Sequence, residues 1–110
     1  MPGFRCTIPA RSTVQQDDAA VRITRWDFEP GANTGWHTHG WPYFVVLLTE
    51  ATLRVHDGEA ETDVNLVAGQ TYRRPAGIEH DVMNASPFAV AFVEIEVKNP
   101  NALASPPESG

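Results

Sequence analysis

Two histidines, His37 and His39, stand one residue apart in the stretch GWHTHGWPYFVVLL (residues 35–48). Side chains alternate between the two faces of a strand, so both imidazoles point to one face, which continues as an apolar lining. Burying two imidazoles side by side without a shared partner costs free energy. A divalent metal ion bound by both neutral rings removes that cost, so the pair predicts a metal site.

A third ligand for this site is expected in the stretch GQTYRRPAGIEHDVMN (residues 69–84), which contains His80. Pro75 and Gly77 form a tight turn before it and direct its side chain inward. The remaining histidine, His56, lies in a polar hairpin and is expected to be a solvated surface residue outside the site. The predicted ligand set is His37, His39 and His80.

The elements that must position these residues are short β-strands. From Val21 onward, turns separate the runs VRITRWDF, WPYFVVLL, TLRV, DVNLV, TYRR, HDVMN and FAVAFVEIEV. Such regular spacing without a helical period predicts an all-β antiparallel barrel or sandwich. We expect an N-terminal arm over residues 1–20, the barrel over 21–97 and a flexible, proline-rich tail over 98–110.

Composition limits the classes of protein to which the chain can belong. Its 110 residues are 42% hydrophobic, which suits one compact core. The net charge of −6 makes nucleic acid and anionic membranes unfavourable partners. Because no apolar run is long enough for a signal peptide or a membrane span, we expect a cytoplasmic protein. The single cysteine, Cys6, has no internal partner for a disulfide and is expected to take no part in the chemistry.

The two histidine-bearing stretches resemble the two motifs of the cupin superfamily, whose fold is a small double-stranded β-helix, or jelly-roll barrel. The second motif is matched at all its fixed positions by Gly69, Pro75, Gly77, His80 and Asn84. The first motif is matched by Gly31, His37 and His39. It departs from the pattern at Tyr43, which stands at the position of the usual glutamate, and at Glu50, which stands at that of the last glycine.

The missing glutamate sets the expected chemistry. Three neutral imidazoles leave a divalent ion with a charge near +2, so the centre favours an anionic or chelating small-molecule substrate. Tyr43, at the vacated position, is the candidate catalytic residue, either hydrogen-bonded to a bound ligand or, as a phenolate, bound to the metal.

The chain looks like the small three-histidine cupins, which include β-diketone-cleaving Fe(II) dioxygenases and cupins associated with β-alanine degradation. This resemblance implies a non-haem Fe(II) dioxygenase that cleaves a small enolisable dicarbonyl compound, and we favour an enzyme of that kind. Two alternatives stay open. One is a Zn-type hydrolase or lyase, and the other is a metal-containing binding or sensor module without turnover. Fe(II) is the expected metal, with Zn, Ni or Mn as alternatives.

Five residues are assigned to the substrate pocket: Trp41, Tyr43, Val45, Arg73 and Glu94. Arg73 and Arg74 precede Pro75, and one of the two guanidinium groups can face an anionic ligand. If its face of the last strand points inward, Glu94 is a candidate to orient a ligand histidine; otherwise it is solvent-exposed.

A second copy of the chain is the expected partner. Phe44, Val46 and Leu48 alternate with the inward-facing set of their strand and are equally apolar. A strand that is apolar on both faces is buried on both faces. We therefore expect a homodimer packed sheet to sheet, an assembly that the resemblance to small cupins also implies.

Overall fold

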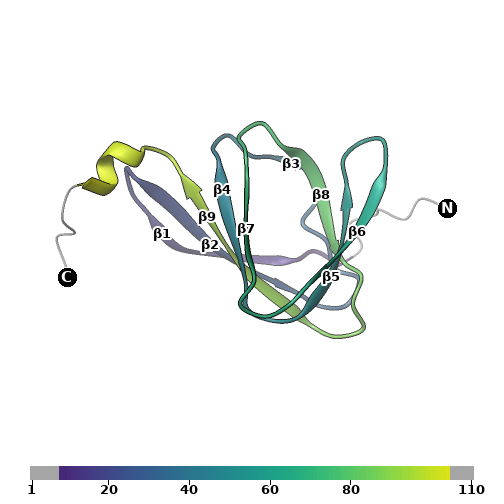
Figure 1. Cartoon of the computed structure of the whole chain (residues 1–110). Coiled ribbons are helices and arrows are strands. Elements are labelled where there is room, and N and C mark those ends of the chain that lie inside the picture. Colours follow the sequence, from purple (N-terminus) through teal and green to yellow (C-terminus); the bar gives the residue numbers. More distant parts are fainter. Residues whose placement is uncertain (1–7, 105–110) are drawn as a thin grey trace.

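The computed structural model describes residues 8–104, whose regular secondary structure is almost wholly β-strand (Figure 1). Its elements are β1 (Arg11–Asp17), β2 (Val21–Phe28), β3 (His37–Thr38), β4 (Tyr43–Leu47), β5 (Ala51–His56), β6 (Glu61–Leu66), β7 (Thr71–Arg74), β8 (Glu79–Asn84), β9 (Val90–Val97) and the 3-10 helix η1 (Pro100–Ala104). Cys6 and the outermost parts of the expected arm and tail lie outside the described residues. No helix in the described part of the chain is long and apolar enough to cross a membrane.

The strands form two antiparallel sheets that enclose one core. The five-stranded sheet has the order β1-β2-β9-β4-β7, and the four-stranded sheet has the order β3-β8-β5-β6. Two strands, β2 and β7, coincide residue for residue with the runs VRITRWDF and TYRR. Their β-branched and aromatic residues favour the pleated, half-buried surface of a strand. The predicted all-β barrel with two antiparallel sheets is confirmed.

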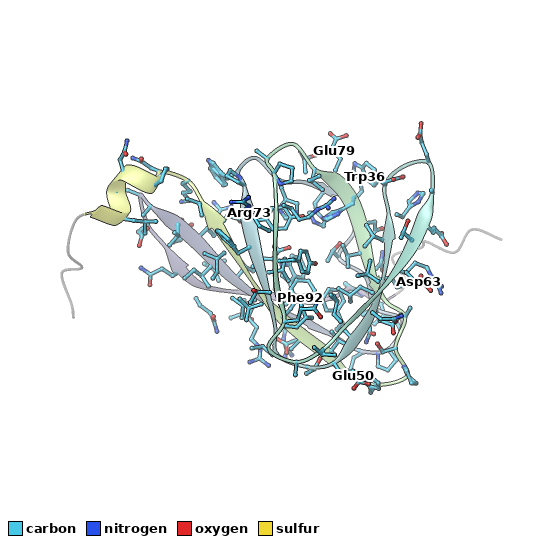
Figure 2. All side chains as sticks on the ribbon, in the orientation of Figure 1. Trp36, Glu50, Asp63, Arg73, Glu79 and Phe92 are labelled. Atoms are coloured by element: carbon cyan, nitrogen blue, oxygen red, sulfur yellow. The ribbon has the colours of Figure 1, made fainter. Side chains whose placement is uncertain are left out.

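The core lies between the inward faces of the two sheets. Tyr43, Val45 and Leu47 of β4 are each less than 3% exposed and pack with residues of the facing sheet such as Leu53. Figure 2 shows the side chain of Phe92, from β9, between the two sheets. These contacts fix the face of β4 that adjoins the histidines, so packing of the core also positions the candidate site.

The outward face of the five-stranded sheet is also apolar. Phe44 lies opposite Ile95 in the β4–β9 pairing. Ile95 in turn lies opposite Ile23 of β2. Val46 and Val93 form the next cross-strand pair on this face. Phe44 is 40% exposed and the others are half-buried, so the described chain leaves an apolar surface spanning β2, β9 and β4.

Part of this sheet extends beyond the barrel. Figure 1 shows the β1–β2 turn, the end of β9 and η1 reaching away from the other strands. The principal extents of the chain are 50 × 26 × 21 Å. All seven residues of β1, which occupy part of the expected arm, are exposed. β1 therefore contributes little to the core.

Candidate metal centre

The three candidate ligands come from neighbouring segments of the four-stranded sheet. His37 of β3 and His80 of β8 are direct cross-strand partners. His39 lies just beyond β3, where its backbone N–H donates to the Ile78 carbonyl over 2.9 Å and its carbonyl accepts from the N–H of Gly77 over 2.8 Å. Gly77 has a φ of 91°, a left-handed conformation that costs glycine little. The predicted turn thus brings the second motif against the first.

The imidazoles converge through their Nε2 atoms. The Nε2 of His39 lies 3.1 Å from that of His37 and 3.2 Å from that of His80. Metal–imidazole bonds of about 2.0–2.1 Å place two ligand nitrogens roughly 3.0 Å apart at a right angle and roughly 3.4 Å apart at a tetrahedral angle. The observed separations lie within that range, so the three side chains could hold one metal ion.

The protonation of the rings suits metal binding. The Nδ1 of His37 lies 2.9 Å from the Gly35 carbonyl, to which it can donate only if it carries the proton, which leaves Nε2 with a free lone pair. Burial lowers the pKa of His39 to about 4, and the neighbouring His37 adds to the effect. Burial likewise lowers the pKa of His80 to about 3. These two imidazoles are therefore neutral at pH 7, as ligation requires.

A buried carboxylate holds the loop that carries His37. Asp81 of β8 accepts hydrogen bonds from the Asn33 side-chain amide over 3.0 and 3.1 Å and from the Gly35 N–H over 3.1 Å. The hydroxyl of Thr34 accepts from the N–H of Val82 over 3.1 Å. This role of Asp81 is not predicted from the sequence, where the available signal is an acidic residue next to the motif histidine.

The ring of Tyr43 stacks on the ring of His39, so the contact between them is made by the ring faces and not by the hydroxyl group. The ring centroids are 3.8 Å apart with an angle of 19° between the planes, and Tyr43 is 2% exposed. Burial raises the pKa of Tyr43 far above its ordinary value, and the charge of Glu94 acts in the same direction. Without a metal ion Tyr43 is therefore a neutral phenol whose ring packs against the candidate ligand His39.

Two carboxylates of β9 lie beside His39. Glu94 is 8% exposed, and its Oε1 accepts a hydrogen bond from the Trp26 indole N–H over 3.1 Å. Its Oε2 lies 3.8 Å from Nε2 of His39, whereas the Oε2 of Glu96 lies 3.8 Å from Nδ1. Because His39 is neutral, neither contact is an ion pair. Burial raises the pKa of Glu94 to about 7, although the Trp26 hydrogen bond acts the other way.

The face of β9 that bears Glu94 thus points inward. Of the two carboxylates, Glu96 lies near the nitrogen of His39 that faces away from the other histidines, the position from which an outer carboxylate orients a ligand ring. Glu94 lies on the side where the three Nε2 atoms converge.

Two cavities flank the histidines. The larger, of about 760 Å³, lies between the sheets and is lined by apolar side chains and by polar ones that include Tyr43, Asp57, Tyr72, Arg74, Glu79, His80 and Glu94. The smaller, of about 420 Å³, lies on the β1–β2 side and is lined among others by Trp26, His37, His39, Glu94 and Glu96. Glu94 lines both cavities, so it stands where they meet the histidine cluster.

The structure brings three of the five assigned pocket residues to the larger cavity: Tyr43, Val45 and Glu94. Trp41 does not line it, because β3 ends at Thr38 and a bend over residues 40–41 breaks the alternation of faces. The Trp41 ring instead lies 5.3 Å from the guanidinium of Arg22 and 5.5 Å from the ammonium of Lys98.

Arg73 is the other assigned residue that does not reach the cavity. Both arginines are exposed, but Arg73 pairs with Phe44, which points outward, whereas Arg74 lines the cavity. His56 lies outside the cluster as expected, but it is half-buried with its ring 6.2 Å from that of Trp36. The expectation that His56 is a solvated surface residue is therefore wrong, because it lies half-buried beside the ring of Trp36.

Comparison with known proteins finds relatives along most of the chain. No family model matches the sequence. The β-alanine degradation protein BauB of Pseudomonas aeruginosa is 54% identical over 86 residues, which are 78% of this chain and 90% of BauB. The crystal structure of a cupin domain from Bordetella pertussis is 43% identical, with a TM-score of 0.80 over 83% of this chain and 95% of that one. A double-stranded β-helix protein from Klebsiella pneumoniae, 19% identical with a TM-score of 0.69 over 86% of this chain and 82% of its own, shares the fold.

Proposed function

Because this chain belongs to the cupin superfamily, in the family of BauB, we propose that it is a metal-dependent enzyme, a non-haem Fe(II) dioxygenase acting on a small enolisable dicarbonyl compound. The observation that carries the proposal is the convergence of three imidazoles beside a partly apolar cavity, with tyrosine at the usual position of a carboxylate ligand.

The donor set fits a first-row divalent ion. Imidazole nitrogens suit Fe, Zn and Ni, and three of them without a carboxylate leave the charge of the ion undiminished. His37, His39 and His80 would hold the ion. When bound, Fe(II) would supply Lewis acidity and the capacity to react with O₂.

The protein supplies the surroundings that such a reaction needs. Apolar side chains of the larger cavity, such as Val45, Leu53 and Phe92, offer a surface against which a small substrate can pack. Glu94, at the meeting point of the two cavities, is placed to hold the proton that leaves the central carbon when a dicarbonyl compound enolises. Cleavage of a 1,3-dicarbonyl compound by O₂ gives a carboxylic acid and a 1,2-dicarbonyl compound, which together contain both oxygen atoms. The name of BauB associates that relative with the breakdown of β-alanine, which supports a small polar substrate.

The proposal is tested by metal analysis and O₂ uptake. Protein purified without added metal should contain iron, or accept Fe(II) at one ion per chain, and should consume O₂ when 2,4-pentanedione is added. The His80→Ala protein should bind no stoichiometric metal and consume no O₂, whereas His56→Ala should behave as wild type because His56 lies outside the cluster. Full metal content in His80→Ala would contradict the ligand assignment.

A zinc hydrolase or lyase is the second candidate, because the separations of the Nε2 atoms suit a tetrahedral ion equally well. Stoichiometric zinc in the purified protein, with no O₂ uptake after loading with Fe(II), would select it. Tight ligand binding without turnover under either metal would select a binding or sensor module.

A further inference from the structure

The larger cavity contains one fixed positive charge. Among the described residues that line it, Arg74 is the single arginine or lysine. Arg74 lies opposite Tyr43 in the β4–β7 pairing. Its charge acts on three other side chains that line the cavity, Tyr43, Tyr72 and His80. The guanidinium therefore stands within electrostatic reach of the histidine cluster.

Within the described part of the chain, this arginine pairs with no carboxylate. Other arginines of the strands do so: Arg25 binds Asp27 over 3.1 Å and Arg54 binds Asp63 over 2.8 Å. Three carboxylates also line the larger cavity, Asp57, Glu79 and Glu94, and none of them forms an ion pair with Arg74. The guanidinium hydrogen-bonds to the Tyr43 side chain but is engaged by no carboxylate of the described residues, which leaves its other donors available for a ligand.

A local cation matters in a chain of this charge. The net charge of −6 disfavours the approach of an anion at long range. An anionic substrate consequently needs a positive group at the cavity itself. The planar guanidinium matches a carboxylate, to which it can donate two parallel hydrogen bonds.

We propose that the substrate is a small 3-oxo carboxylate, whose carboxylate is held by Arg74 while its oxo end faces the cluster of His37, His39 and His80. The inference rests on the proposed function and narrows the dicarbonyl compound to one with an acidic end. Apolar side chains such as Val45, Leu53 and Phe92 line the same cavity and favour an uncharged remainder of the substrate.

Two nearly isosteric ligands test this role of Arg74. Acetoacetate and 2,4-pentanedione differ in one group, a carboxylate oxygen in place of a methyl group. Titration calorimetry with Zn-loaded protein measures binding without O₂ chemistry. Arg74→Gln should weaken the binding of acetoacetate about 10- to 100-fold, the range expected for a hydrogen bond to a charged group. It should leave the affinity for 2,4-pentanedione unchanged.

Arg73→Gln is the matched control. It removes the same charge from the neighbouring residue, whose side chain is also exposed but does not line the cavity. It should bind both ligands as wild type. Arg74→Lys keeps the charge but loses the paired donors, so it should bind acetoacetate between wild type and Arg74→Gln. Metal content of one ion per chain establishes that each variant retains the site.

Three outcomes overturn the inference. They are an equal loss of acetoacetate affinity in Arg73→Gln and Arg74→Gln, an equal loss of affinity for both ligands in Arg74→Gln, and no binding of acetoacetate by the wild type. The dioxygenase proposal fails separately. If acetoacetate binds through Arg74 but the Fe(II)-loaded wild type consumes no O₂ with either compound, the carboxylate site stands and the proposed reaction does not. Conversely, if the wild type consumes O₂ with 2,4-pentanedione but does not bind acetoacetate, the proposed reaction stands and the carboxylate site at Arg74 does not.

Discussion

His39 is the most constrained of the three candidate ligands. Tyr43 covers one face of its ring, the side chains of His37 and His80 face its Nε2, and Glu96 lies near its Nδ1. Such contacts hold a ring in the orientation that ligation needs before any ion binds. They also keep the ring away from water, which determines how the metal-free protein responds to pH.

The metal-free protein should lose stability as the pH falls from about 6.5 toward 4. Above the unfolded pKa of 6.5 the folded and unfolded states of His39 and His80 are both neutral, so these residues add nothing to the pH dependence. Below it the unfolded state takes up protons that the folded state refuses until its own pKa, about 4 for His39 and about 3 for His80. Between these two pKa values, each histidine lowers the free energy of unfolding by about 1.4 kcal/mol per pH unit.

Glu94 acts in the opposite direction over part of this range. Its folded pKa of about 7 exceeds the unfolded value of 4.5, so the folded state holds the extra proton and gains stability as the pH falls toward 4.5. Urea unfolding of chelator-treated protein at several pH values measures the net effect of the two histidines and Glu94 on the free energy of unfolding. Glu94→Gln should steepen the decline and His80→Asn should flatten it. A metal-free wild type with the same stability at pH 7 and pH 5 would contradict these assignments.

Tyr43 should matter to the site through its ring. Tyr43→Phe keeps the stacking on His39 and should retain one metal ion per chain. Tyr43→Ala leaves a cavity beside His39 and should lower the free energy of unfolding by about 3–5 kcal/mol and weaken metal binding. Urea unfolding and competition with a chelator measure both effects. A Tyr43→Phe protein that keeps its metal but loses turnover would support the catalytic role assigned from the sequence, whereas unchanged turnover would reduce Tyr43 to packing.

At the scale of elements, the loop before β3 depends on β8. Asp81 is the acceptor for the buried Asn33 amide and for the N–H of the half-buried Gly35, and Asp81→Ala would leave those donors without a partner. We expect Asp81→Ala to weaken metal binding about 10- to 100-fold although all three histidines remain. Chelator competition measures the change. Asp63→Ala, which removes an exposed carboxylate bound to Arg54 on β5, should leave metal affinity as in wild type. Equal affinities in the two variants would contradict the positioning role of Asp81.

Elements with local signals are the part of the fold that the sequence predicts well. The run VRITRWDF and the spacing around Pro75, Gly77 and His80 contain enough information to place β2 and the second motif. Alternation predicts the inward face of β4 because it continues over five residues without a break. It fails for Trp41, where a bend interrupts the strand.

Features set by long-range register are the part that the sequence does not reveal. The inward direction of Glu94 follows from the pairing of β9 with β2 and β4. The register of β7 against β4 determines that Arg74, and not Arg73, lines the larger cavity. The support given by Asp81 requires the loop at Asn33 to lie against β8, 48 residues away in sequence.

For the whole molecule, the apolar outward face of the five-stranded sheet is the dominant exposed feature. Phe44, Ile95 and Ile23 form a row across three strands. Monomeric proteins rarely leave a contiguous apolar surface open. We expect a second copy of the chain to cover it about a two-fold axis, with the exposed strand β1 available to pack against the partner.

Light scattering should therefore give a mass of about twice the 12.1 kDa of one chain. Phe44→Asp should shift the protein to the monomer without loss of metal, because its side chain points away from the histidines. Phe88→Asp is the matched control: Phe88 is also 40% exposed but lies on the turn before β9, so this variant should remain dimeric. A monomeric wild type at micromolar concentration would contradict the assembly.

The alternation of β9 has a consequence for how the chain tolerates insertions and deletions. Glu94 and Glu96 point toward the histidines, while Val93 and Ile95 point outward on the same strand. Deleting one residue at the start of β9 would exchange the two faces, placing valine and isoleucine beside His39 and carboxylates on the apolar surface. Deleting two residues would preserve the faces and shift only the register. A deletion series through residues 88–91 should therefore alternate between proteins that lose soluble expression and proteins that keep it.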